Sequence, residues 1–338
     1  MKESKLCKNI KENVIQCLAC IHYCVLNPND FGKCGVRQNL GGKLIALNYG
    51  KICALNIDPI EKKPLFHFLP GTLSLSLASE GCNFSCANCQ NWSISQGPKI
   101  NKEIGGEIVS INRILEIAKK NRTPSISYTY TEPTIFVDFA FDLMKKAKKA
   151  GLKNVWVSNG FMSIETLEMT SPYLDAINVD LKSFSEKFYQ EICGARLQPV
   201  LENLKKIKQR KIWLEITTLT IPTLNDTEEE MKKIAGFIKS ELGDDVPLHI
   251  TQFSPALSWK LKNLRETDEK TLVKLYKTAK DIGLKYVYTG NIPGLDSENT
   301  FCPKCNNLLV ERFGYLIKRF DKAGSCPKCN YKIEGLFN

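Results

Sequence analysis

The chain has 338 residues, of which 43% are hydrophobic, enough for two domains or for one large domain with appendages. No run of eighteen apolar residues occurs and the polar N-terminus lacks a signal-peptide core, so we expect a cytoplasmic protein with no membrane contact. The formal net charge of +11 is spread over lysines on helical segments, which favours a solvated surface over a nucleic-acid footprint.

Fourteen cysteines are present, a high number for a chain without an export signal. In such a chain metal ligation explains the cysteines better than disulfides do. Eleven of them fall into three clusters, and the remaining Cys7, Cys53 and Cys193 are interpreted as ordinary thiols.

The pattern along the chain predicts three parts. Residues 1–70 are rich in turns and carry the first cysteine cluster. Residues 71–295 alternate strand-like and helix-like segments, and residues 296–338 contain the last cysteine cluster. We therefore expect a regular central domain flanked by two small metal-binding regions.

The first cluster has the spacing C-x2-C-x3-C-x9-C and consists of Cys17, Cys20, Cys24 and Cys34. We expect these thiols to form one closed metal site, with His22 as a further candidate ligand. Structural zinc is favoured, and a second iron–sulfur cluster is the alternative. Further along, His67 lies in a proline-rich and aromatic segment and is at least as consistent with a core histidine as with a catalytic one.

The central part has the periodicity of a parallel α/β protein. Strands are expected at 72–79, 125–130, 154–158, 176–181, 211–219, 248–253 and 285–289. Helices are expected at 111–121, 134–151, 199–210, 227–243 and 269–283, several of which end in glycine. Parallel strands joined by right-handed crossovers form a full or partial (βα) barrel if the sheet closes. A doubly wound open sheet is the alternative fold. In both folds the functional site lies at the carboxyl ends of the strands.

The stretch EGCNFSCANCQNW follows the first of these strands and contains Cys82, Cys86 and Cys89 in a C-x3-C-x2-C spacing. A structural zinc site needs four protein ligands, and the chain has only three histidines to complete one. Three thiolates on a cubane cluster leave one iron open for a substrate or cofactor. We therefore predict an iron–sulfur site at the active edge of the fold.

The C-terminal part contains two C-P-K-C knuckles separated by twenty residues. Their thiols, Cys302, Cys305, Cys326 and Cys329, have the spacing of a zinc ribbon. The tail is too short for a core of its own, so zinc binding would supply its folding energy. Iron in a rubredoxin-like state is the alternative.

The C-x3-C-x2-C loop after the first strand resembles the radical S-adenosylmethionine (radical SAM) enzymes. The resemblance implies a partial (βα)6 TIM-like barrel with a 4Fe–4S cluster on Cys82, Cys86 and Cys89. It also implies that S-adenosylmethionine (SAM) chelates the open iron and is cleaved to a 5′-deoxyadenosyl radical, which abstracts hydrogen from a substrate.

The SAM-binding residues are assigned by position in this resemblance. The literal Gly-Gly-Glu at 105–107 is rejected because it precedes the first predicted helix. YTEPT follows the second strand, and its glutamate can accept from the SAM ammonium group. VSNGF and VDLKS resemble strand ends of the activating enzymes of glycyl-radical enzymes. The expected SAM contacts are therefore Thr131, Glu132, Ser158, Asn159, Asp180 and Lys182.

Three departures argue against a glycyl-radical activating enzyme proper. Asn88 replaces an aromatic residue before the third cysteine, Val157 occupies a position that is often Asp, and the start of the chain lacks the glycine-rich opening of that branch. A closer resemblance is to the AmmeMemoRadiSam system radical SAM enzymes, carried by FGKCGVRQN at 31–39, the block at 47–71, and YTGNIPG at 288–294. It implies Memo-like and AMMECR-like proteins as partners.

The main hypothesis is thus a cytoplasmic radical SAM enzyme that takes electrons from a ferredoxin or flavodoxin and acts on a protein or peptide. The alternatives are a glycyl-radical activating enzyme, a zinc-ribbon protein that binds nucleic acid with a steep salt dependence, and a redox carrier without a SAM site. The sequence leaves open the substrate, the hydrogen abstracted and the oligomeric state.

Overall fold

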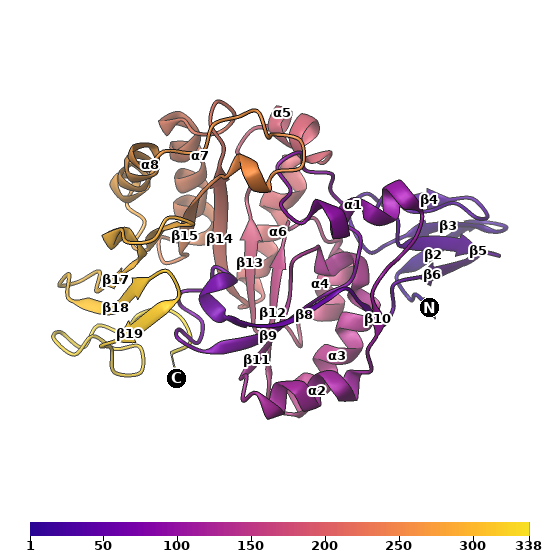
Figure 1. Cartoon of the computed structure of the whole chain (residues 1–338), viewed down its shortest axis with the longest axis horizontal. Helices are drawn as coiled ribbons and strands as arrows, with labels where there is room; N and C mark the ends of the chain where they lie inside the picture. Colours follow the sequence, from indigo (N-terminus) through magenta and orange to yellow (C-terminus); the bar gives the residue numbers. More distant parts are fainter. Residues whose placement is uncertain (338) are drawn as a thin grey trace. The chain divides into compact units, whose positions relative to one another are not determined.

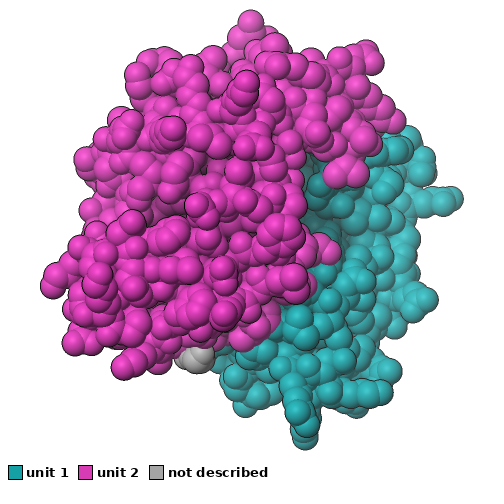
Figure 2. Space-filling view, turned by 60° about the vertical axis from the view of Figure 1, so that its left-hand side comes forward, with its two compact units in different colours: residues 1–58, 73–177, 193–195 teal, residues 59–72, 178–192, 196–338 magenta. Residues whose placement is uncertain are grey.

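The computed structural model describes residues 1–337 and divides the chain into two compact units. The first unit contains residues 1–58, 73–177 and 193–195, and the second contains residues 59–72, 178–192 and 196–338. Figure 2 colours the two units separately. Residues 73–290, which belong to both units, alternate strands and helices along the chain, as the sequence predicts.

The N-terminal segment of the first unit forms small antiparallel sheets, whereas the sequence indicated only turns. One sheet has the order β1 (Lys2–Glu3), β6 (Lys43–Ala46), β5 (Arg37–Leu40). A second has the order β2 (Cys7–Lys11), β3 (Val14–Cys17), β4 (Val25–Leu26), and β7 (Lys51–Ile52) pairs with β10 (Glu107–Ile108). These strands have two to five residues, too short for a clear period-two pattern.

The main sheet of the first unit has the strand order β8 (Ala54–Pro59), β9 (Leu73–Ala78), β11 (Ser125–Tyr128), β12 (Lys153–Ser158). Strands β9, β11 and β12 are parallel and in register. Ser74 and Ser127, on neighbouring strands, are fully buried and hydrogen bond to each other at 2.6 Å between hydroxyl oxygens. The alternating leucines and serines of β9 therefore belong to a strand that is buried on both faces. The Ser74 and Ser127 hydroxyls can be buried because they form a hydrogen bond with each other.

Helices run alongside these strands in Figure 1. Helix α2 (Ile111–Lys120) contacts β9 and α3 (Val137–Lys149), and α3 contacts β12 and α4 (Ile164–Thr170). Ser110 and Ser163 cap α2 and α4 by accepting from backbone N–H groups three residues later. The sequence missed α4 and also α1 (Trp92–Asn101), which carries Gly97 and an internal Pro98. Strand β13 (Ala176–Asp180) has its first two residues in this unit and the others in the second.

The second unit continues the alternation with α6 (Leu197–Gln209), β14 (Trp213–Thr220), α7 (Glu228–Phe237), β15 (Leu248–Gln252), α8 (Glu269–Ile282) and β16 (Val287–Gly290). Strands β14, β15 and β16 are parallel neighbours, α6 contacts β14, and α8 contacts both β15 and β16. Thr227 caps α7, and Asp268 caps α8, which ends at Gly283 with a φ of 105°. The predicted helix 227–243 becomes α7 followed by a short π-helix, Ile238–Leu242.

The C-terminal part of the second unit is a small antiparallel sheet with the order β17 (Thr300–Phe301), β18 (Leu308–Phe313), β19 (Leu316–Arg319). Short helical turns complete the unit at Ile60–Lys62, Glu186–Phe188, Tyr189–Cys193, Pro255–Leu257 and Asp296–Glu298. Within residues 1–337, no helix is both long and apolar enough to cross a membrane.

Candidate functional site

The three-cysteine loop lies between β9 and α1, at the carboxyl end of the first parallel strand. Gly81 enters the loop with a φ of 105°, and a Cβ there would lie 3.0 Å from the Cys34 carbonyl oxygen and 2.7 Å from a Val36 methyl. Only glycine fits this conformation at such a close approach. The loop therefore leaves the sheet along one fixed path.

The loop turns its thiols toward backbone and side-chain donors. The Phe84 N–H points at the Cys82 sulfur at 3.4 Å, and the Cys89 sulfur lies 3.4 Å from the Ser95 hydroxyl. Burial raises the pKa of the Cys82 thiol well above its usual range, and the Glu132 carboxylate raises it further. A thiol in this place becomes a thiolate when a metal ion supplies the compensating charge.

The three sulfurs of this loop do not form a compact one-ion group. In the described part of the chain, only the four C-terminal cysteines form a group of three or more possible ligands whose donor atoms all lie within 4.8 Å of one another. A single zinc ion holds its sulfurs about 3.8 Å apart, given Zn–S bonds of about 2.3 Å. In a cubane cluster each thiolate binds a different iron, so wider spacing is required.

A buried carboxylate lies after the second parallel strand. Glu132 is 1% exposed and accepts four hydrogen bonds. Its Oε1 accepts from the Thr134 N–H (3.1 Å), the Thr134 hydroxyl (2.5 Å) and the Ser158 hydroxyl (2.9 Å), and its Oε2 accepts from the Asn159 N–H (2.7 Å). Burial raises the pKa of Glu132, and these donors oppose the rise. The carboxylate thus ties YTEPT to VSNGF, and sequence reasoning had not foreseen this bond.

Asn159 extends the connection to the cysteine loop. Its side-chain amide donates to Asn83 Oδ1 at 2.7 Å and lies 4.0 Å from the Cys82 sulfur. On the other side of the loop, His22 Nε2 lies 2.8 Å from the Asn83 carbonyl oxygen. The sequence-predicted residues Cys82, Glu132, Ser158 and Asn159 are therefore brought together within the first unit.

Two further groups fix the loop. The Thr131 hydroxyl donates to the Ser79 carbonyl at 2.7 Å, which anchors YTEPT to the end of β9. The Lys99 ammonium donates to the Phe84 carbonyl (2.6 Å) and to the Ser85 hydroxyl (3.0 Å). Burial lowers the pKa of Lys99, while the neighbouring thiols Cys82, Cys34, Cys86 and Cys89 oppose this. Sequence reasoning missed Lys99 because no motif distinguishes it from the other lysines.

The remaining predicted SAM residues belong to the second unit. Lys182 Nζ lies 2.6 Å from Asp180 Oδ2, and the lysine side chain is 15% exposed. The Lys182 backbone N–H faces the Tyr189 hydroxyl at 3.2 Å, and its carbonyl accepts from the Asn225 side chain at 2.8 Å. The strand end VDLKS is thus a fixed backbone segment whose ion pair is partly open to solvent.

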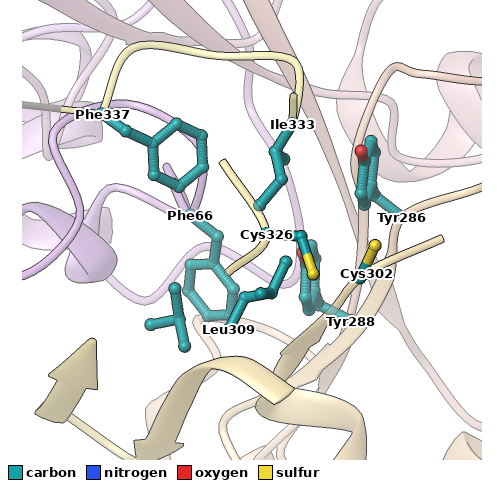
Figure 3. Packing of buried hydrophobic residues seen from close by; sticks show 9 residues of the cluster. Phe66, Tyr286, Tyr288, Cys302, Leu309, Cys326, Ile333 and Phe337 are labelled. Atoms are coloured by element: carbon teal, nitrogen blue, oxygen red, sulfur yellow. The ribbon is translucent and has the colours of Figure 1, made fainter. Parts of the chain in front are cut away.

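The four C-terminal cysteines converge as the sequence predicts. The sulfurs of Cys302 and Cys329 lie 3.5 Å apart, and those of Cys305 and Cys326 lie 3.6 Å apart. Cys302 and Cys326 are also part of a buried hydrophobic cluster, shown in Figure 3, that contains Phe66, Tyr286, Tyr288, Leu309, Val310, Ile333 and Phe337. The compact thiol group fits a single metal ion, which would hold this cluster together.

His67 is a core histidine. It is fully buried, and its ring nitrogens lie 2.8 Å from the Glu334 carbonyl oxygen and 2.6 Å from the Tyr288 hydroxyl. Burial lowers the pKa of His67 to about 4, so the ring is neutral at pH 7.

Sequence reasoning missed Glu215, a fully buried carboxylate on β14. It accepts from the Phe66 and His67 N–H groups at 2.9 and 2.8 Å, from Trp213 Nε1 at 2.9 Å, and meets His249 Nε2 at 2.7 Å. An acid within the apolar run KIWLEITTL was the available signal, since such a group needs buried partners.

A cavity of about 270 Å³ lies in the second unit, near the carboxyl ends of β15 and β16. Its lining includes Glu61, His249, Thr251, Asn291 and Tyr315. Glu61 is 4% exposed; its Oε1 accepts from the Gly71 N–H, whereas its Oε2 has no hydrogen-bond partner among the described residues.

Comparison with known proteins gives the family. The model of the Radical SAM superfamily matches residues 77–238. "Uncharacterized protein MJ0808" of Methanocaldococcus jannaschii is 41% identical over 337 residues, which cover 99% of each chain. The pyruvate formate-lyase-activating enzyme of Clostridium pasteurianum is 23% identical over 216 residues, 60% of this chain and 88% of that enzyme.

Solved structures share the fold. A radical SAM methyltransferase from Sphaerobacter thermophilus superposes with a TM-score of 0.53 at 10% identity, covering 71% of each chain. Streptococcus suis SuiB bound to precursor peptide SuiA gives a TM-score of 0.52 at 18% identity, covering 69% of this chain and 51% of SuiB. The expected radical SAM α/β fold is thereby confirmed. The chain belongs to the Radical SAM superfamily and is an enzyme of the type that resembles the pyruvate formate-lyase activating enzymes.

Proposed function

We propose that Cys82, Cys86 and Cys89 bind a 4Fe–4S cluster at which the enzyme cleaves S-adenosylmethionine reductively. The observation that carries this proposal is the three-cysteine loop after β9, where the Cys82 sulfur lies 4.0 Å from the Asn159 side-chain amide and Glu132 accepts from Ser158 and Asn159. When bound, the cluster offers its open iron to the amine and carboxylate of SAM and supplies one electron, which yields a 5′-deoxyadenosyl radical.

The chain's own residues orient the cofactor. Thr131, Ser158 and Asn159 of the first unit, and Asp180 and Lys182 of the second, are the proposed SAM contacts. The Lys182 ammonium suits the SAM carboxylate. Glu132 already accepts four hydrogen bonds, so its main role in this proposal is to hold the Ser158–Asn159 turn in place.

The proposed substrate is a protein or a peptide. Relatives of this chain are named as activating enzymes, and SuiB was solved with a precursor peptide. A cytoplasmic ferredoxin or flavodoxin is the proposed electron donor. The alternative function is activation of a glycyl-radical enzyme, in which that enzyme would be the protein substrate.

Two further assignments belong to the same proposal. The compact C-terminal thiol group binds zinc, because sulfur separations of 3.5 and 3.6 Å are close to those around one tetrahedral zinc ion.

Memo-like and AMMECR-like proteins are proposed as partners on the basis of the sequence resemblance. Co-purification of the three proteins tests this, and a failure to associate with activity intact would argue against it.

The deciding experiment uses protein purified and reconstituted without oxygen, then given dithionite and SAM. Wild-type protein should release 5′-deoxyadenosine, and Cys86→Ala should release none. Cys7→Ala is the matched control, because its thiol donates to the Ser4 carbonyl oxygen at 3.5 Å and lies outside the three-cysteine loop, so it should keep full activity. Undiminished cleavage in Cys86→Ala would overturn the assignment.

A further inference from the structure

The N-terminal cysteines line one small cavity of the first unit. Its lining includes Cys17, Cys20, Cys24, Cys34 and Arg37. Cys17 ends β3, Cys24 precedes β4, and Cys34 lies shortly before β5. All four are free thiols, and together they form the ligand set for which the sequence left zinc and a second iron–sulfur cluster open.

Tight turns deliver these thiols to the cavity. The Cys17 N–H donates to the Cys24 carbonyl at 2.9 Å, and the Gly35 N–H donates to the Gly32 carbonyl at 2.9 Å. Gly35 has a φ of 77°, and a Cβ there would lie 3.0 Å from the backbone of α1. The backbone turn that follows Cys34 therefore has little conformational freedom.

Backbone donors point at the sulfurs. Burial raises the pKa values of the Cys17, Cys20 and Cys34 thiols, and the backbone N–H groups of Ala19, His22 and Val36, respectively, lower them. Such N–H···S bonds stabilise sulfur that carries negative charge in metal and cluster sites.

A buried cation completes the lining. Arg37 is 1% exposed; it donates to Ser4 Oγ at 2.9 Å and to Asp138 Oδ2 at 2.6 Å. Its remaining donor, Nε, is buried and has no hydrogen-bond partner among residues 1–337. A buried donor of this kind needs an acceptor, and an anionic occupant of the cavity supplies one.

The spacing of the sulfurs separates the two possible occupants. The C-terminal cysteines show how this chain forms a one-ion site, with sulfurs 3.5 and 3.6 Å apart. Over the described residues, no three of the N-terminal thiols have sulfurs that all lie within 4.8 Å of one another. Four thiols that share one cavity without gathering as the C-terminal thiols do favour a cubane cluster, in which each thiolate binds a different iron.

We propose that Cys17, Cys20, Cys24 and Cys34 bind a second 4Fe–4S cluster, fully ligated by protein. With four thiolates it has no open iron for a substrate, so its role is to carry electrons. Each electron that it takes from a one-electron donor, of the ferredoxin or flavodoxin class, leaves again to the cluster of the three-cysteine loop.

The position of the cavity supports this role. The Cys34 carbonyl oxygen would lie 3.0 Å from a Cβ at Gly81, the residue before Cys82. His22, between Cys20 and Cys24, lies 2.8 Å from the Asn83 carbonyl oxygen through its Nε2. The two cysteine loops are therefore in direct contact within the first unit.

The test measures metals and spectra of the full chain, reconstituted without oxygen. Wild-type protein should hold about eight irons and about one zinc. A Cys82→Ala/Cys86→Ala/Cys89→Ala variant should keep about four irons and, after dithionite, an electron paramagnetic resonance signal that SAM does not change. In reduced wild-type protein, spin coupling between the two clusters should broaden the signals.

A Cys20→Ala/Cys24→Ala variant should lose about four irons and keep a signal that responds to SAM. Cys7→Ala is the matched control: Cys7 lies opposite Cys17 in the β2–β3 register but does not line the cavity, so it should keep all the iron. About four irons and two zincs in wild-type protein, or an iron-free triple variant with two zincs, would overturn the proposal. The proposed SAM cleavage is judged separately, by 5′-deoxyadenosine from wild-type protein.

Discussion

Replacing Glu132 by Gln tests how the buried carboxylate organises the site. The Glu132 Oε1 has three donors around it, so the amide oxygen of Gln would take that side and the NH2 group would face the Asn159 N–H. One charge-assisted hydrogen bond is lost, at about 1.5–3 kcal/mol, and one buried donor is left unsatisfied, at about 1–3 kcal/mol. Local opening of the Ser158–Asn159 turn should therefore become easier by about 3 kcal/mol or more.

Amide hydrogen exchange measures this change at a single group. Since about 1.4 kcal/mol is a factor of ten, the Asn159 amide should exchange about 10²-fold faster in Glu132→Gln. Glu165→Gln is the matched control: this carboxylate accepts from the Tyr23 hydroxyl at 3.0 Å in the same unit, and its loss should leave Asn159 unaffected. Unchanged exchange of Asn159 in Glu132→Gln would refute the reasoning.

The same variant separates a positioning role for Glu132 from direct contact with SAM. If Glu132 acts through the turn, its effect on the dissociation constant of SAM should be non-additive with that of Ser158→Ala. Additive effects would show that the carboxylate acts on SAM independently of Ser158.

Three other outcomes are expected. Lys182→Met should weaken SAM binding about tenfold, while Lys187→Met should not, as measured by equilibrium binding; equal affinity in both would contradict the assignment of Lys182. Cys305→Ser should release about one zinc, lower the melting temperature and increase binding of a hydrophobic dye. The reason is that the hydrophobic cluster in Figure 3 would lose the metal that cross-links its cysteines, and Lys304→Ala serves as the control. In the zinc form, nuclear magnetic resonance should show His67 neutral down to about pH 5, and a midpoint near 6.5 would contradict its burial.

The His67 titration also fixes the sign of a stability effect. Its pKa falls from 6.5 to about 4 on folding, so the folded protein favours the neutral ring. The contribution to stability is complete above pH 6.5 and is lost as the pH falls toward 4.

The sequence alone identified the residue patterns on which the proposed chemistry rests. The C-x3-C-x2-C loop, its place after the first parallel strand, and the paired knuckles at the C-terminus are local patterns, and each needs only neighbouring residues to be recognised. The alternation of strands and helices likewise predicted the α/β fold, because hydrophobic periodicity is set within each segment. The short N-terminal strands, α1 and α4 escaped it because they lack that periodicity.

Only the tertiary structure decided which residues meet. Glu132 lies 27 residues before Asn159, and Arg37 lies 101 residues before Asp138, yet both pairs share a buried hydrogen bond. Sequence spacing also could not separate a one-ion site from a cluster site, since both use turns that present two thiols. Among the described residues, the C-terminal thiols gather within 4.8 Å of one another, and such a group depends on how turns that are distant in the sequence pack together.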